Sequence, residues 1–152
     1  MSLMFPIERS DMPDIKAHID KAEHNREFLE TICQYVERFA DWVAVVAFYS
    51  ALHYVEALFF RFQPSGQKHG TSHEMRERLL KSQRRFKKVA RHYWHLWQAA
   101  TIARYLQNGK GQLYTTFTDY MSPDNVVDRL IKHHFRRLRE SVGKLLSSGR
   151  GA

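Results

Sequence analysis

Histidines and clustered cations are the side chains of this chain that are best suited to chemistry. The 152 residues include nine His, and 24 Lys or Arg stand against 16 Asp or Glu, which gives a formal net charge of +8. Near neutral pH, His acts as a general base or binds a metal, whereas surplus Lys and Arg favour polyanionic partners such as nucleic acid. A merely basic, solvated surface is the alternative explanation of the charge.

The cations gather in two stretches, each of which is predicted to lie on a helix. Several cations on one surface suit phosphate groups, because each contact releases counterions from a nucleic acid. Tyr93, Trp94 and Phe135 could stack on unpaired bases, but we favour core packing for these aromatic residues, whose spacing fits a packed stripe. The candidate nucleic-acid-binding residues are Arg84, Arg85, Lys87, Lys88, Arg91, Lys132, Arg136 and Arg137.

Two pairs of His have spacings that suit a metal site on one helix face. His69 and His73 are four residues apart, and His92 and His95 are three residues apart. Neither pair has an evident third ligand, and no HExxH motif is present. Cys33 is the only cysteine, which excludes a disulfide framework and a Cys-based metal site. We therefore expect no metal site and no cofactor.

One apolar segment, residues 42–60, must position these groups. It reads WVAVVAFYSALHYVEALFF, contains no Lys or Arg, and follows Asp41, a candidate N-cap. Such a helix must be enclosed by other helices or by a partner chain. A membrane span is disfavoured, because each ionisable residue costs about 2.5–3.5 kcal/mol at bilayer depth. Either His53 hydrogen-bonds to Tyr49 or Glu56 within the core, or these three residues line a polar pocket between helices.

The remaining sequence is predicted to supply the enclosing helices, which makes the chain an all-α bundle. Capping signals include a box of Thr71 with Glu74, a stop at Asn108-Gly109, and a start at Ser122-Pro123-Asp124. A stripe on the last helix is expected to comprise Val127, Leu130, His134, Leu138 and Leu145. The predicted helices cover about 14–40, 41–62, 71–82, 84–107 and 122–147, with an ordered loop at 110–121.

The chain is expected to hold one domain over residues 13–147, with tails at 1–12 and 148–152. The N-terminus has no basic stretch followed by an apolar one, so we expect a cytoplasmic protein. The sequence lacks GxGxxG, P-loop, GxSxG and CxxC motifs. Nucleotide-binding folds of the Rossmann and P-loop types are therefore excluded.

The order of these features resembles the HEPN superfamily of small helical domains. The resemblance covers about residues 15–145 and rests on HIDKAEHNREFLE, DWVAVVAFYSALHYVEALF, SHEMRERL and a third helix that ends in ARY. It implies a four- to five-helix up-and-down bundle that forms a homodimer and acts on or binds RNA, in a toxin–antitoxin, defence or regulatory setting. It also implies a possible nucleotidyltransferase-type partner protein.

Active members of that superfamily are metal-independent ribonucleases whose Arg and His are separated by four to six intervening residues, near the junction of the last two long helices. Here Arg104 stands at the junction and no His follows at that spacing. His73 and Arg76 would form a substitute catalytic cluster with Arg104 if the loop folds back. Two pairs with the family spacing lie inside long helices and match what chance predicts: Arg85 with His92, and Arg129 with His134.

Three functions remain as alternatives from the sequence. The first is binding of RNA or another polyanion by a domain whose catalytic motif is degenerate. The second is a metal-independent endoribonuclease, in which His73 or His134 is the general base for the 2′-hydroxyl and an Arg stabilises the phosphorane. The third is a non-catalytic protein-interaction module that uses the exposed part of the central helix.

Overall fold

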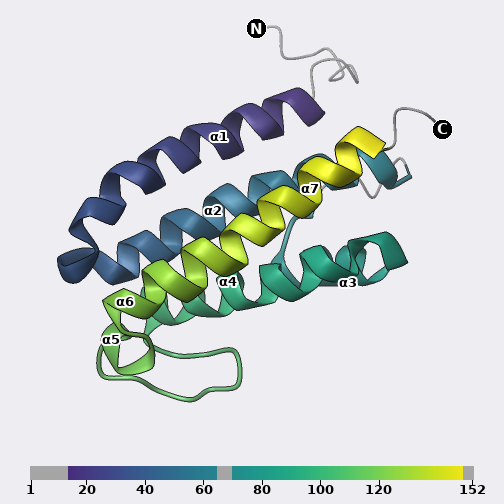
Figure 1. Cartoon of the computed structure of the whole chain (residues 1–152). Coiled ribbons are helices and arrows are strands. Elements are labelled where there is room, and N and C mark those ends of the chain that lie inside the picture. Colours follow the sequence, from purple (N-terminus) through teal and green to yellow (C-terminus); the bar gives the residue numbers. More distant parts are fainter. Residues whose placement is uncertain (1–13, 65–69, 149–152) are drawn as a thin grey trace, which may run out of the picture.

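The computed structural model describes residues 14–64 and 70–148, and over these residues the chain is an all-α bundle (Figure 1). The expected tails lie outside the described residues, except that Ser148 ends the last helix. The helices are α1 (Ile15–Ile32), α2 (Val36–Phe62), α3 (His73–Lys81), α4 (Lys87–Tyr105), α5 (Phe117–Tyr120), α6 (Pro123–Asn125), the π-helix η4 (Val126–Phe135) and α7 (Arg136–Ser148), with 3-10 turns η2 (Cys33–Tyr35) and η3 (Arg84–Phe86).

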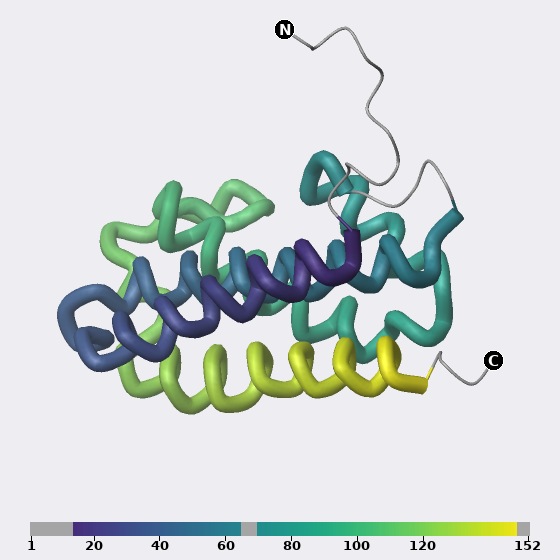
Figure 2. Tube along the Cα trace, turned by 90° about the horizontal axis from the view of Figure 1, so that it is seen from above, coloured from purple at the N-terminus to yellow at the C-terminus, as the bar shows by residue number. Residues whose placement is uncertain are grey.

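The long helices alternate in direction along the bundle. Helices α1 and α2 run antiparallel, α4 runs antiparallel to α2, and α7 runs back along α4 (Figures 1 and 2). Helix α2 contacts α1, α4, η4 and α7, so it is the central helix that the sequence predicts. Its stretch is long and apolar enough to cross a membrane, but 83% of the most apolar window is buried inside the bundle.

The buried run of α2 begins at a kink. Helical hydrogen bonding starts at Val36, but Phe39 has φ −126° and ψ 40°, which lies outside the helical region. The Asp41 carboxylate accepts a hydrogen bond from the Trp42 amide at 2.9 Å. The regular part of α2 begins just after this kink, close to the predicted start, but Asp41 is not the predicted N-cap because its carboxylate bonds to the next amide and not to one two or three residues on.

The cap of α3 differs from the predicted capping box. The Ser72 hydroxyl, not that of Thr71, accepts the first-turn hydrogen bond, from the Met75 amide at 3.1 Å. Ser72 has the extended backbone of an N-cap, with φ −148° and ψ 166°. The Thr71 hydroxyl lies 3.5 Å from the Met75 sulfur instead. The predicted N-cap, Thr71, is one residue before the observed one, because two adjacent residues with hydroxyl groups compete for the capping position.

Helix α4 ends earlier than the Asn108-Gly109 signal predicts. Its last residue is Tyr105, and Leu106 takes the left-handed conformation with φ 54° and ψ 32°. The chain then reverses, with a β-bridge between Gln107 and Leu113. The expected loop after it contains a short helix, α5, which a capping box of Thr116 and Asp119 begins.

The last long helix begins at Ser122-Pro123 as predicted, but its first part is π-helical. In an α-helix, the residue four positions after Leu130 shares its buried face. That residue is His134, but in the wider π-helix the fifth residue, Phe135, takes the buried position. His134 is half-buried beside it. The predicted stripe was therefore wrong at Val127 and His134. The residues of η4 and α7 that are buried are Val126, Leu130, Phe135, Leu138 and Val142.

Candidate functional site

The histidine cavity is a hollow of about 490 Å³ between α4 and the η4–α7 helix. Because these helices run antiparallel, residues about forty positions apart face one another across it. Four of its lining residues are cations and three are histidines, whereas one is a carboxylate. The lining comprises Lys88, Arg91, His92, His133, His134, Arg137, Glu140, Ser141 and Lys144.

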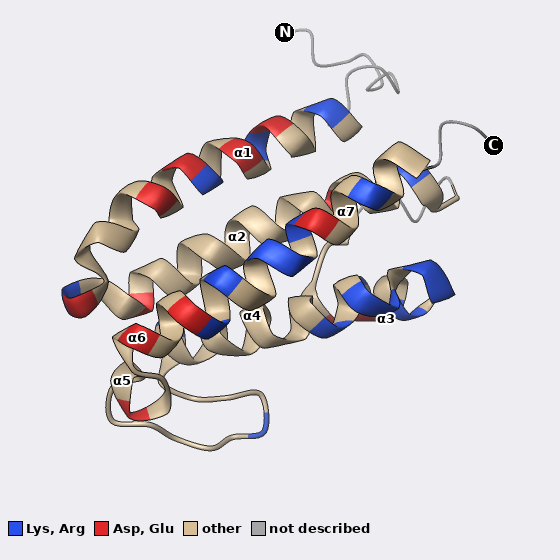
Figure 3. Cartoon of the chain, in the orientation of Figure 1, with Lys and Arg blue, Asp and Glu red and all other residues tan. Residues whose placement is uncertain are grey.

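The four cations give the histidine cavity a positive charge. Lys88 and Arg91 come from α4, and Arg137 and Lys144 come from α7. All four are exposed, and none forms an ion pair with a described residue. Lys and Arg recur along α7 and around α3 and the start of α4 (Figure 3). The cavity is therefore suited to an anion that carries several charges.

The histidines of this cavity form a tight cluster. The Nδ1 atoms of His92 and His134 are 3.1 Å apart, and the rings of His95 and His134 stack with centroids 4.0 Å apart. His133 lies edge-on to His92, with ring centroids 5.4 Å apart. One ring nitrogen from each of His92, His133 and His134 lies within 4.8 Å of the others.

Burial keeps the imidazoles of His92, His95 and His134 neutral at pH 7 by lowering their pKa. It lowers the pKa of His92 to about 4 and that of His134 to about 3, and nearby cationic groups act in the same direction. Burial lowers the pKa of His95 as well. Neutral imidazoles have a free lone pair, so they can accept a proton or a metal ion.

Sequence reasoning missed the partners of His92. It found no third ligand, because His133 and His134 belong to a helix about forty residues further along the chain. The two consecutive histidines on the predicted last helix were the sequence feature that could have indicated them. Lys144 was missed for a similar reason, because it is isolated in sequence and joins the other cations only when α7 packs on α4.

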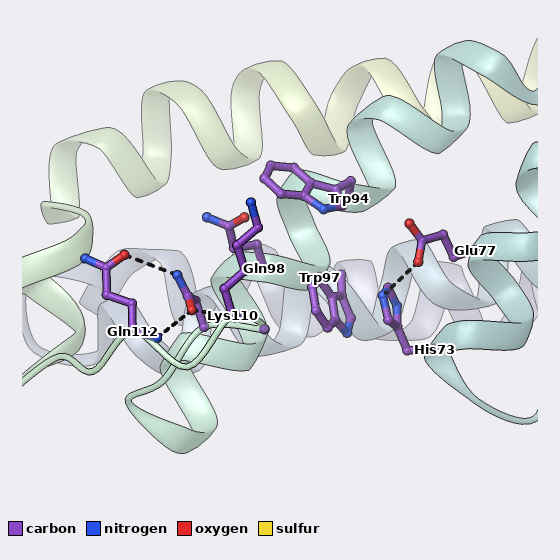
Figure 4. A pocket seen from close by; sticks show the side chains of 9 residues that line it. His73, Glu77, Trp94, Trp97, Gln98, Lys110 and Gln112 are labelled. Atoms are coloured by element: carbon purple, nitrogen blue, oxygen red, sulfur yellow. Dashed lines mark hydrogen bonds and ion pairs between the residues drawn. The ribbon is translucent and has the colours of Figure 1, made fainter.

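The aromatic cavity, of about 410 Å³, lies on another side of α4 (Figure 4). The His73 imidazole stacks on the Trp97 indole, with centroids 3.7 Å apart and planes 6° apart, and its Nε2 is 3.6 Å from the Glu77 carboxylate. Trp94 is 41% exposed at the cavity. The full lining is His73, Glu77, Trp94, Trp97, Gln98, Asn108, Gly109, Lys110 and Gln112.

A third cavity lies next to each of the other two. Its volume is about 320 Å³, and it shares Arg91 with the histidine cavity and His73, Glu77 and Trp94 with the aromatic cavity. Trp94 also contacts His95 edge-on, with ring centroids 5.0 Å apart. The three hollows therefore form a band across α4, which we call the α4 band.

The structure brings only some of the predicted nucleic-acid-binding residues to this band. Lys88, Arg91 and Arg137 line it. The Arg85 guanidinium lies 4.5 Å from the centroid of the Phe62 ring, and the Lys132 amino group lies 3.8 Å from the Asp128 carboxylate. Three residues are exposed but line none of the three cavities: Arg84, Lys87 and Arg136. Of the candidate base-stacking residues, Tyr93 and Phe135 are buried and Trp94 is exposed.

The predicted catalytic cluster is not assembled. His73 stacks on Trp97, and the Arg76 Nε lies 3.3 Å from the Glu56 carboxylate. Arg104 donates a hydrogen bond to the Tyr49 hydroxyl at 3.2 Å and lines none of the three cavities. Arg104 lies on α4 two turns beyond Trp97, the residue on which His73 stacks, so Arg104 and His73 are separated.

The predicted pocket of Tyr49, His53 and Glu56 is not formed either. Each of the three side chains contacts a different neighbouring helix. Tyr49 meets α4 through Arg104, and Glu56 meets α3 through Arg76. The Nδ1 of His53 lies 3.0 Å from that of His18 on α1, so its partner is neither of the two residues predicted.

Comparisons with protein families, with curated proteins and with solved structures found no match.

Proposed function

We propose that this chain binds RNA, or another polyanion, on the α4 band. The observation that supports this proposal best is the histidine cavity, where four exposed cations converge from two helices without ion-pair partners among the described residues. Cations held in this way bind phosphate groups and release their counterions. The net charge of +8 favours the same class of partner.

The aromatic cavity favours a single-stranded RNA over a duplex. The exposed indole of Trp94 offers a face on which a base can stack, and stacking of this kind is a main source of affinity for single strands. The side-chain amides of Gln98, Asn108 and Gln112 lie at the same cavity and can hydrogen-bond to base edges. Phosphates in the histidine cavity and a base at Trp94 then belong to one strand.

The wider setting of this proposal comes from the HEPN resemblance. We place the chain in that superfamily, as a cytoplasmic homodimer whose catalytic motif is degenerate and which works in a toxin–antitoxin, defence or regulatory setting. A nucleotidyltransferase-type protein is the expected partner. Trp42 on α2 is 55% exposed, and Tyr105 at the end of α4 is 65% exposed, so apolar surface is available for association. Light scattering should give twice the 18.0 kDa chain mass.

Gel retardation of a single-stranded RNA tests the binding site. We expect the double variant Arg91→Ala/Arg137→Ala to weaken binding about tenfold or more, because two phosphate contacts are lost. The matched control is Lys21→Ala/Arg38→Ala, which removes the same charge from exposed residues that line none of the three cavities. Equal weakening by both double variants would show that charge alone, not the band, determines binding.

A metal-independent endoribonuclease is the second candidate function. Its active site would be the histidine cavity and not the pair His73 and Arg104, which the structure does not bring together. His134 would take the 2′-hydroxyl proton, and Arg91 or Arg137 would stabilise the phosphorane. A base whose pKa is about 3 accepts protons poorly, so a bound phosphate would have to raise that pKa. Products with 2′,3′-cyclic ends in EDTA, lost in His134→Ala, would support cleavage, and uncut RNA would exclude it for that substrate.

A further inference from the structure

The cluster of His92, His133 and His134 presents three ligand atoms of the same kind to one point. One ring nitrogen of each lies within 4.8 Å of the other two, and the His92 and His134 Nδ1 atoms are 3.1 Å apart. Two nitrogens on a tetrahedral zinc ion, each bonded at 2.0–2.1 Å, are about 3.3–3.4 Å apart. The closest pair shares an N–H···N hydrogen bond at 3.1 Å, so its separation is already close to that of two ligands on zinc. Metal binding requires the donor ring to take its Nε2–H tautomer, which frees both Nδ1 lone pairs for the ion.

The third nitrogen needs only a small movement to join them. Because no distance in the set exceeds 4.8 Å, a shift of about 1.5 Å brings it to the zinc spacing. His133 has an exposed side chain, so rotation about its Cα–Cβ bond meets little resistance, whereas His92 is 5% exposed and held by packing. The site has one buried ligand, one half-buried ligand and one exposed ligand.

The type of ligand selects the class of metal. Imidazole nitrogens suit Zn²⁺, Cu²⁺ and Ni²⁺, whereas Mg²⁺ and Ca²⁺ prefer oxygen ligands. Three His ligands with a fourth position left to a small molecule is an arrangement found in catalytic zinc sites. The remaining position would face the histidine cavity, where the surrounding cations favour an anionic ligand.

We propose that His92, His133 and His134 bind one divalent transition-metal ion, with Zn²⁺ as the best fit, and leave one coordination position open to an anion. The metal site lies in the histidine cavity, but its formation requires no RNA. This inference goes beyond the proposed function, which predicts binding without a metal.

Metal titration of the untagged, EDTA-treated chain tests the site. We expect calorimetry with ZnCl₂ to show one equivalent bound, and CoCl₂ to give the visible absorption of a four-coordinate ion. His133→Ala should lower Zn²⁺ affinity by at least about tenfold, because a ligand is lost from an exposed position where the fold is not at risk. His24→Ala is the matched control, because His24 is an exposed His on α1 outside the cluster.

Three results would overturn the proposal. These are binding well below one equivalent, affinity that His133→Ala leaves unchanged, and an equal loss in His24→Ala. Addition of thiocyanate should change the Co²⁺ spectrum, and an unchanged spectrum would show that no position is open to an anion. RNA retardation in EDTA is measured separately, so failure of the metal site and failure of RNA binding are distinguishable.

Discussion

Glu56 places a carboxylate in the core of the bundle, where it is 3% exposed. It accepts hydrogen bonds from the Gly70 amide at 3.0 Å and from the Arg76 Nε at 3.3 Å. A Cβ at Gly70 would collide with the Arg76 side chain, so this approach requires glycine. A buried charge is tolerated when its partners are in place. Glu56 thus ties Gly70, and α3 through Arg76, to the central helix.

Truncation of Arg76 should destabilise the fold. We expect Arg76→Ala to lower the free energy of unfolding by about 2–3 kcal/mol, because a charged hydrogen bond to a buried carboxylate is lost. Urea denaturation measures the change. Lys81→Ala is the control, because Lys81 forms an exposed ion pair with Glu77, and it should cost less than about 1 kcal/mol. Similar losses in the two variants would contradict the structural role of Arg76.

For single residues, the sequence indicated which side chains are candidates for a site better than it indicated which residues they contact. Lys88, Arg91 and Arg137 belong to cation-rich stretches, so the sequence alone made them candidates, and the structure places them at one cavity. His53 could not be paired correctly, because its partner His18 lies on a different helix, 35 residues away. Contacts between distant segments depend on how helices pack, which spacing within one helix does not reveal.

The η4 helix determines which side chains of the last long helix meet the core and which meet the histidine cavity. Its wider turn moves Phe135 into the core and leaves His134 at the cavity beside His92. π-helical segments occur often at functional sites. Here the segment supplies two of the three clustered histidines of that cavity.

Alanine substitutions at the adjacent positions 134 and 135 distinguish the π-helical register from that of a regular α-helix. Phe135→Ala should lower the free energy of unfolding by about 3–5 kcal/mol, because it opens a cavity in the core. His134→Ala should cost clearly less in metal-free protein, because His134 is half-buried at the cavity wall. Chemical denaturation in EDTA gives both values. The reverse order would mean that the helix keeps the α-helical register predicted from sequence.

Helix existence was predictable, and helix ends were less so. The apolar periodicity of the long helices and the Ser122-Pro123 start are local signals, and the structure confirms them. The cap at Ser72 and the left-handed Leu106 were not found, because adjacent residues compete for the same role. The π turn was missed since a single sequence assumes one helical period throughout.

For the whole molecule, five histidines whose pKa is lowered contribute to the response to acid. Burial is the main cause that lowers the pKa of His53, His73, His92, His95 and His134. In the unfolded chain these imidazoles have a pKa near 6.5. Below that pH the unfolded state binds protons that the folded state does not, so acid favours unfolding.

The free energy of unfolding should therefore decrease as the pH falls from 7.5 to 5.5. Denaturation in EDTA at a series of pH values measures this, in a range above the ordinary pKa of Asp and Glu. His73→Gln should make the pH dependence shallower, because one lowered pKa is removed. Stability that stays flat or rises over this range would contradict the burial of the imidazoles.

The salt dependence of RNA binding tests the α4 band most directly. If Lys88, Arg91, Arg137 and Lys144 each contact a phosphate, they contribute about −2.8 to the slope of log K against log [salt] for a single strand. We predict that replacing all four by Ala makes the slope shallower by about that amount, while the circular dichroism spectrum stays helical. A slope that is the same in the wild type and the quadruple variant would contradict the proposed site.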